Sequence, residues 1–208
     1  MREIKIAMKK NLQVALSACF LGLALLVSSC EKKAKKEALT AAQADSLHHT
    51  FLVIQDSLNA TWERMIEDDN QKIADAKRLL EEVSYTNNYD IVQFDSLQQD
   101  LAQLLEMRYS STSMAEPSAI DNYDSASNKV INTIMTIASE HPDFARYPLM
   151  KTLIKDIQEA NGRVLRQRVN YDYAAKLHNQ FIEENKDVLE EVDSLKGIEK
   201  KPLFELDS

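Results

Sequence analysis

Histidine and cysteine, the usual ligands of transition metals, are sparse in this chain of 208 residues, which has four histidines and two cysteines. The only histidine pair, His48-His49, is adjacent in sequence. Neighbouring side chains on a helix point about 100° apart, so the two rings cannot converge on one ion. The acidic run Glu67–Asp69 lacks the glycine and the alternating ligands of a calcium loop. We therefore predict a solvated histidine pair, a charged helix face, and no cofactor or metal.

Three arginines, Arg163, Arg166 and Arg168, lie within six residues of one another. The arginine fork suits carboxylate or phosphate. In a chain with 33 acidic residues, we expect acids on adjacent helices to be the main partners. An anion-binding site is the alternative.

Catalytic side chains have little support in the sequence. Tyr171, Tyr173 and His178 could line a groove, but Tyr171 and His178 share the spacing of an apolar stripe and are expected in or beside the core. We find no glycine-rich phosphate loop, no nucleophile elbow and no supported Ser/His/Asp set. Few loops are long enough to carry catalytic residues. The sequence predicts a non-enzyme, and it identifies no small-molecule substrate.

The residue with the most specific predicted chemistry is Cys30. Residues 1–29 have the pattern of a signal peptide, with a basic start and an apolar run over Leu12–Val27. That run is shorter than the roughly 20 residues of a spanning helix. The segment Leu26–Cys30 resembles a lipobox, in which the cysteine thiol receives a diacylglyceryl group and the peptide before it is removed. An uncleaved membrane anchor is the alternative, and it would leave the same domain on the same side of the membrane.

Removal of residues 1–29 changes the charge balance. It takes four of 25 basic residues and one of 33 acidic residues, which leaves 21 and 32, a difference of −11. Phosphate binding needs basic groups, so we predict no nucleic-acid partner. The cluster Lys32–Lys36 would follow the lipid directly, either as a contact to an anionic bilayer or as a solvated tether. No cysteine remains for a disulfide.

The elements that must position these residues are helices. Neither glycine nor proline occurs between Cys30 and Pro117, which is unusual for a sheet protein. Over 40–83 the apolar stripe has a mean step of 3.6 residues, and only Asp69 interrupts it. A second helix with leucines at 97–105 is expected to begin at a cap formed by Asp95 or Ser96. Residues 110–118 are expected to form a loop.

The second half of the chain contains two more predicted helices. One carries the apolar positions of 120–137 and ends at His141-Pro142. The other spans 149–195 with a seam of alternating four- and three-residue steps, as in a coiled coil, and contains Gly162. The sequence thus predicts an all-α fold, an elongated antiparallel bundle with two long and two shorter helices. The predicted organisation is a signal peptide over 1–29, a tether over 30–39, the bundle over 40–195 and an irregular tail over 196–208.

Part of the chain resembles the LemA family. His141–Phe144 is similar to the family's Tyr-Pro-x-Leu loop, and Gly197–Glu205 resembles its Gly-Phe-x-x-Lys-Pro-Tyr-Phe-Glu ending. Between these segments the match continues through Met150, Leu153, Ile157, Arg163, Val164, Arg168, Tyr171, Asn179 and Ile182. The N-terminal half matches only around Trp62.

Several positions depart from the family pattern. Asp172 replaces an asparagine and His178 a tyrosine, and Ala76–Leu80 stands where the family has Leu-Ile-Pro-Asn-Leu. Typical members carry an N-terminal membrane helix, whereas this chain is predicted to use a lipid. The resemblance implies an all-helical, membrane-anchored envelope protein with no established enzymatic activity.

These observations favour a non-enzymatic interaction or scaffold module, tethered through Cys30 in the bacterial cell envelope with its domain outside the cytoplasm. Its partner is predicted to be an envelope protein or a second copy. An envelope enzyme or metal-dependent protein with an unrecognised site, and a periplasmic holdase chaperone, are alternatives. Four polar positions, Arg163, Arg168, Tyr171 and Asn179, are expected to serve either the bundle or a partner.

Overall fold

The computed structural model describes residues 39–86 and 88–204. The predicted signal peptide, Cys30 and most of the predicted tether lie outside these residues. Within them the chain is all-α, without strands, and contains the helices α2 (Ala41–Ser84), α3 (Ile91–Met107), α4 (Pro117–Ser139) and α5 (Pro148–Leu189). The predicted all-α class, with two long and two shorter helices, is confirmed for this part of the chain.

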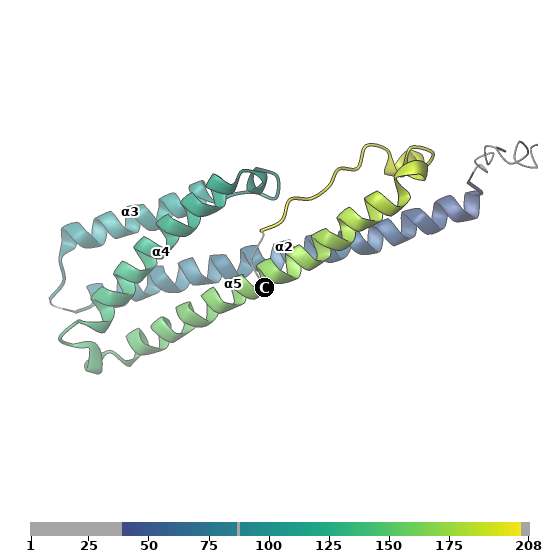
Figure 1. Ribbon diagram of the computed structural model, residues 1–208. Helices are drawn as coiled ribbons and strands as arrows, with labels where there is room; N and C mark the ends of the chain where they lie inside the picture. Colours follow the sequence, from purple (N-terminus) through teal and green to yellow (C-terminus); the bar gives the residue numbers. More distant parts are fainter. Residues whose placement is uncertain (1–38, 87, 205–208) are drawn as a thin grey trace, which may run out of the picture. The chain divides into compact units, whose positions relative to one another are not determined.

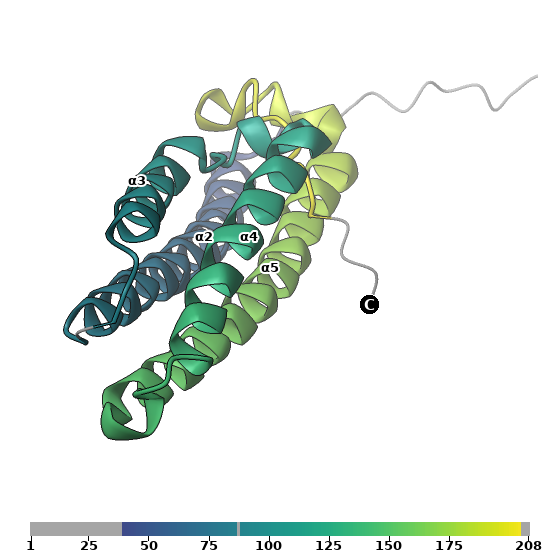
Figure 2. The same cartoon turned by 90° about the vertical axis from the view of Figure 1, so that its left-hand side faces the viewer.

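The two long helices form the main packing pair. α2 and α5 lie side by side and run in opposite directions (Figure 1). α3 and α4 contact each other and cover the C-terminal half of α2 (Figures 1 and 2). Single 3-10 turns lie in the connections, at Ser113–Ala115, Phe144–Arg146 and Asp193–Leu195.

Local sequence explains how the helices begin. Thr40 and Gln43 form a reciprocal capping box at the start of α2, in which the Gln43 N–H donates to Thr40 Oγ1 at 3.3 Å and the Thr40 N–H donates to Gln43 Oε1 at 2.9 Å. α4 and α5 each begin with a proline, whose missing N–H would have no helical partner at that position.

Three predicted boundaries were wrong. α3 begins at Ile91 rather than after Asp95 or Ser96, because Asp90 Oδ1 accepts the N–H groups of Val92 and Gln93 at 2.9 and 3.1 Å. α4 begins at Pro117, inside the predicted loop. α5 ends at Leu189 rather than at position 195. Three acidic residues follow directly, at positions 190, 191 and 193, and negative charge disfavours a helix C-terminus.

One continuous apolar core runs between the helices. The predicted seam of α5 is buried at eight of its nine positions, and only Gln167 is half-buried. The stripe of α2 is fully buried from Leu58 onward except for Trp62, and half-buried before Leu58. α3 and α4 cover only the later part of α2, so α5 is the main helix that packs against its early turns.

None of the described helices has an apolar stretch long enough to cross a bilayer.

Residues 196–204, here called the C-terminal strap, have no regular secondary structure, as predicted. They are nevertheless part of the packed unit. Gly197 adopts a φ of 71°, a conformation that side chains disfavour, as the chain turns back after α5. The strap then returns alongside α5 toward its middle (Figure 1). Its last described residue, Phe204, is buried against the core.

Candidate functional site

A buried cluster of charged and phenolic side chains lies where α2, the α3–α4 connection, α4 and α5 meet. Asp69 of α2 is its centre, and it is buried although the sequence predicted a charged helix face at Glu67–Asp69. That prediction was wrong for Asp69, because this position lies on the apolar stripe that faces the core. The interruption of the stripe was the available signal.

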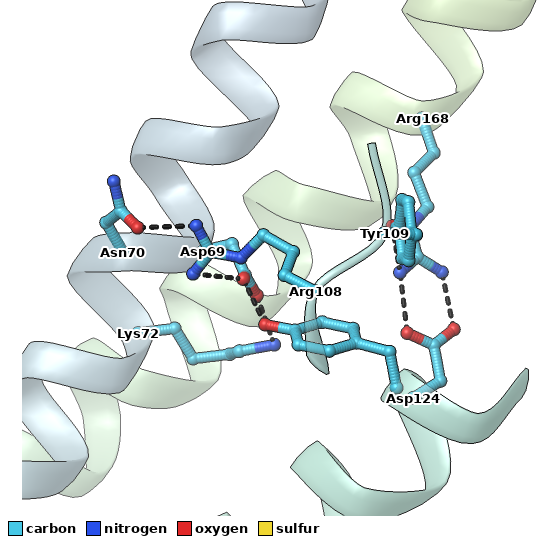
Figure 3. Close-up of polar contacts among 8 residues, drawn as sticks. Asp69, Asn70, Lys72, Arg108, Tyr109, Asp124 and Arg168 are labelled. Carbon is cyan, nitrogen blue, oxygen red and sulfur yellow. Dashed lines mark hydrogen bonds and ion pairs between the residues drawn. The ribbon is translucent and has the colours of Figure 1, made fainter. Parts of the chain in front are cut away.

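Two cations and one hydroxyl compensate the Asp69 carboxylate. Lys72 Nζ lies 2.9 Å from Oδ1, and Arg108 Nη2 lies 2.9 Å from Oδ2. The hydroxyl of Tyr123 donates to Oδ2. Arg108 also donates to Asn70 Oδ1 at 2.7 Å, as Figure 3 shows. A single carboxylate thereby connects α2 to α4 and to the α3–α4 connection.

A second ion pair joins α5 to α4. Arg168 donates to both carboxylate oxygens of Asp124, each at 2.6 Å, and to the hydroxyl of Tyr109 at 2.8 Å (Figure 3). This is the two-pronged geometry that suits an arginine fork. The guanidinium carbon also lies 5.7 Å from the ring centre of Tyr109 and 5.1 Å from that of Phe204. Cation–π attraction adds to the ion pair at such distances.

The phenols of this cluster are held protonated. Burial raises the pKa of Tyr109 to about 12, against the opposing effect of Arg168. Burial also raises the pKa of Tyr171 to about 12, with the nearby charge of Asp172 acting in the same direction. The pKa of Tyr123 is raised by burial and by Asp69. At neutral pH these hydroxyls stay neutral and do not act as bases.

Aromatic rings close the cluster on the side of the strap. Phe204 stacks on Trp62 at 6.4 Å between ring centres, and it meets Tyr171 and Tyr109 edge-on at 5.5 and 5.8 Å. Trp62 meets Tyr171 at 5.5 Å. Edge-on contacts at these separations are favourable for aromatic pairs.

Two side chains of α5 hold the strap through its backbone. Asn179 donates to the Lys201 carbonyl at 2.8 Å and accepts the Lys201 N–H at 2.7 Å. Asp172 Oδ1 accepts the N–H of Phe204 at 2.7 Å. This second contact uses only the acceptor capacity of the Asp172 side chain.

The structure separates the four polar positions singled out from the sequence. Arg163 donates to Asp68 of α2 at 2.6 Å, Arg168 belongs to the buried cluster, Tyr171 lies in the core, and Asn179 binds the strap. The expected pairing of Arg163 and Arg168 with the chain's own acids is confirmed. No single site collects all four residues.

The remaining histidine predictions concern His48, His49 and His178. His49 is exposed and His48 half-buried, whereas His178 is buried, as expected for a stripe residue. The His178 ring lies 5.7 Å from that of Phe51, and its Nδ1 has no hydrogen-bond partner among the described residues. Burial lowers the pKa of His178; nearby Lys201 acts in the same direction, while a hydrogen bond with Asn179 opposes it.

Sequence reasoning missed Arg108, Tyr109, Tyr123 and Asp124 as members of the cluster. Tyr123 was identified only as an apolar position of the third predicted helix. Arg108 and Tyr109 directly precede the loop predicted at 110–118, and no periodic pattern marks them. Their partners are 38 to 59 residues away in the chain, which local spacing does not indicate.

The chain matches no family model, none of the curated proteins and none of the solved structures. Over the residues that the structure describes, it is an all-α protein with an internal charged cluster. The resemblance to the LemA family stays a prediction.

We expect Arg168→Ala to lower the free energy of unfolding by about 2–3 kcal/mol, because Asp124 and the Tyr109 hydroxyl lose their partner. Asn179→Ala should also destabilise, since the strap loses two backbone hydrogen bonds. Denaturant unfolding measures both. The exposed Arg166→Ala is the matched control and should stay within about 0.5 kcal/mol. Unchanged unfolding of both variants, together with loss of a bound partner, would instead place these residues in a partner site.

The lowered pKa of His178 predicts a stability that depends on pH. The unfolded state binds the proton more readily than the folded state. The contribution of His178 to the free energy of unfolding is therefore complete above about pH 6.5, and it is lost as the pH falls from there through the folded pKa. We expect His178→Leu to reduce the loss of stability between pH 7 and pH 5, measured as the shift in urea midpoint. His49→Gln changes an exposed position, and this variant should lose as much stability between pH 7 and pH 5 as the parent protein. Identical pH profiles for the parent and His178→Leu would contradict this account.

Proposed function

We propose that this chain is a lipid-anchored, non-enzymatic helical module of the bacterial cell envelope, and that it holds a partner protein on the outward face of α5. The observation that carries the proposal is a row of large apolar side chains on that face. We call Leu165, Val169, Tyr173 and Leu177 the α5 ridge; their exposed fractions are 48, 53, 68 and 40 %.

The ridge is regular, and it lies opposite the core. Its members follow one another at four-residue steps, the spacing of a continuous ridge on a helix. The buried residues Val164, Tyr171 and His178 occupy the other side of the same turns. A single exposed leucine needs no explanation, but a continuous apolar row is typical of a surface that another molecule covers.

Helix packing is the mode of binding that such a face favours. A partner helix can lay an apolar stripe against side chains at i and i+4. The interior favours a non-enzymatic role, because the buried cations and carboxylates of the cluster pair with one another. We therefore assign these polar groups to stability, and the ridge to binding.

The anchor is proposed on sequence grounds. The basic start, the apolar run, the two serines and Cys30 together have the order of a lipoprotein signal. The partial resemblance to the LemA family also favours a membrane-anchored envelope protein. Stable attachment needs more than one acyl chain, which lipoprotein maturation would supply.

Replacement of Cys30 tests the anchor. We expect Cys30→Ala to remain an unprocessed precursor and to incorporate no labelled fatty acid, because the acceptor thiol is gone. Cys19→Ala is the matched control, since Cys19 lies within the segment predicted to be removed, and it should be processed and labelled normally. Fatty-acid labelling of Cys30→Ala at the parent level would disprove the anchor.

Photo-crosslinking in living cells tests the ridge. A photoreactive residue placed at Val169 of the full chain should yield a discrete cross-linked protein, because this position is proposed to lie against a partner. The control is the same residue at Val53 of α2, which is 57 % exposed but lies outside the ridge, and it should yield none. Mass spectrometry of the adduct identifies the partner. Absence of any adduct at Val169 would overturn the proposed binding function.

A further inference from the structure

We infer that the partner on the α5 ridge is a second copy of this chain, with the two α5 helices antiparallel about a twofold axis at the level of Tyr171. The inference rests on the proposed function, since it names the occupant of the same surface. A twofold interface requires one patch to be complementary to itself when it is reversed. The ridge and the charges beside it have this property.

The apolar positions are symmetric about Tyr171. Leu165 and Leu177 each lie six residues from it, and Val169 and Tyr173 each lie two residues from it. In an antiparallel pair, Leu165 would therefore face Leu177 of the second copy, and Val169 would face Tyr173. Every exposed apolar side chain of the ridge would then contact an apolar side chain of the second copy.

The charges along α5 favour the antiparallel orientation over the parallel one. Apart from Arg168 and Asp172, which are buried and bound inside the chain, residues 148–170 contain four basic and two acidic residues, and residues 172–189 contain three acidic and two basic residues. An antiparallel pair sets the basic half of each helix against the acidic half of the other. A parallel pair would set like charge against like, which disfavours association.

Individual positions follow this pattern beyond the ends of the ridge. Lys155 and Asp187 lie sixteen residues on either side of Tyr171, and they would face each other across the pair. Glu159 would face Glu183, but each has a cation of its own chain nearby: Lys155 lies 3.2 Å from Glu159, and Lys200 pairs with Glu183. Arg166 would face Lys176. Both side chains are long and exposed, so their charged ends can turn to solvent.

Gly162 provides an independent reason to expect a close neighbour. Glycine inside a helix costs about 1 kcal/mol relative to alanine. The chain's own packing does not require it, because an added Cβ would meet only the Arg166 side chain at 3.5 Å, an ordinary contact. Gly162 lies one turn before Leu165 on the outward side of α5. A glycine there lets the backbone of another helix approach closely.

Cysteine cross-linking of the full chain in its membrane tests the register. Gln158 and Glu184 each lie thirteen residues from Tyr171, so a Gln158→Cys copy coexpressed with a Glu184→Cys copy should form a cross-linked dimer. Two copies of Gln158→Cys should not, since their cysteines would be about 39 Å apart along the helix. Dimers from Gln158→Cys alone would show a parallel pair and overturn the inference.

A ridge variant shows whether the dimer depends on the proposed surface. Val169→Glu introduced into the Gln158→Cys and Glu184→Cys copies should lower the yield of dimer at least tenfold, whereas Val53→Glu should leave it unchanged. Circular dichroism melting of each variant checks that the fold is retained. An unchanged yield with Val169→Glu would exclude the ridge as the interface.

The two proposals fail in different ways. If photo-crosslinking at Val169 captures only another protein, and the mixed cysteine copies give no dimer, the second-copy inference is wrong while the binding function stands. If the ridge gives no adduct of any kind, both are wrong. An adduct that contains only this chain, with the mixed-copy dimer, supports both.

Discussion

The buried carboxylate of Asp69 constrains the whole helical unit. An ionised group taken out of water costs several kcal/mol unless it is paired and hydrogen-bonded. Asp69 therefore requires Lys72, Arg108 and Tyr123 close by, and two of these come from outside α2. The requirement fixes how α2 is rotated about its axis and where α4 and the α3–α4 connection lie against it. An apolar residue at this position would allow several registers, because leucine packs acceptably against many neighbours.

Arg108 and Tyr109 extend this constraint to α5. They are adjacent in the chain, and one binds Asp69 while the other accepts a hydrogen bond from Arg168. The short connection after α3 is thus held by ion pairs and hydrogen bonds where it has no regular secondary structure of its own. Phe204 completes the arrangement, since it packs on Tyr109, Tyr171 and Trp62 and lies beneath the Arg168 guanidinium. The strap is therefore part of the folded unit and not an appendage.

α5 has three faces with different physical roles. One face is the apolar seam against α2, and a second carries Arg168, Asp172 and Asn179, which bind α4 and the strap. The third carries the ridge. With the first two faces occupied inside the chain, the outward face carries four of the five large apolar side chains that are exposed on α5. This division explains why binding is proposed on a helix whose other residues are fixed by internal contacts.

The sequence by itself determined the all-α class, the existence of four helices and which side of each long helix is buried. Those features depend on local rules, namely the 3.6-residue period of the apolar stripes and the near absence of glycine and proline. It also indicated Asp69 as an interruption of the stripe, and Arg168 and Asn179 as polar residues on the seam-bearing helix. The start of α3 was missed because several residues there could act as a cap, and only the geometry selects Asp90.

The tertiary structure alone decided which groups pair. Tyr123 reaches Asp69 across 54 residues, and Asp124 reaches Arg168 across 44. Such pairings depend on the rotation and spacing of one helix against another, which core packing sets and no local pattern records.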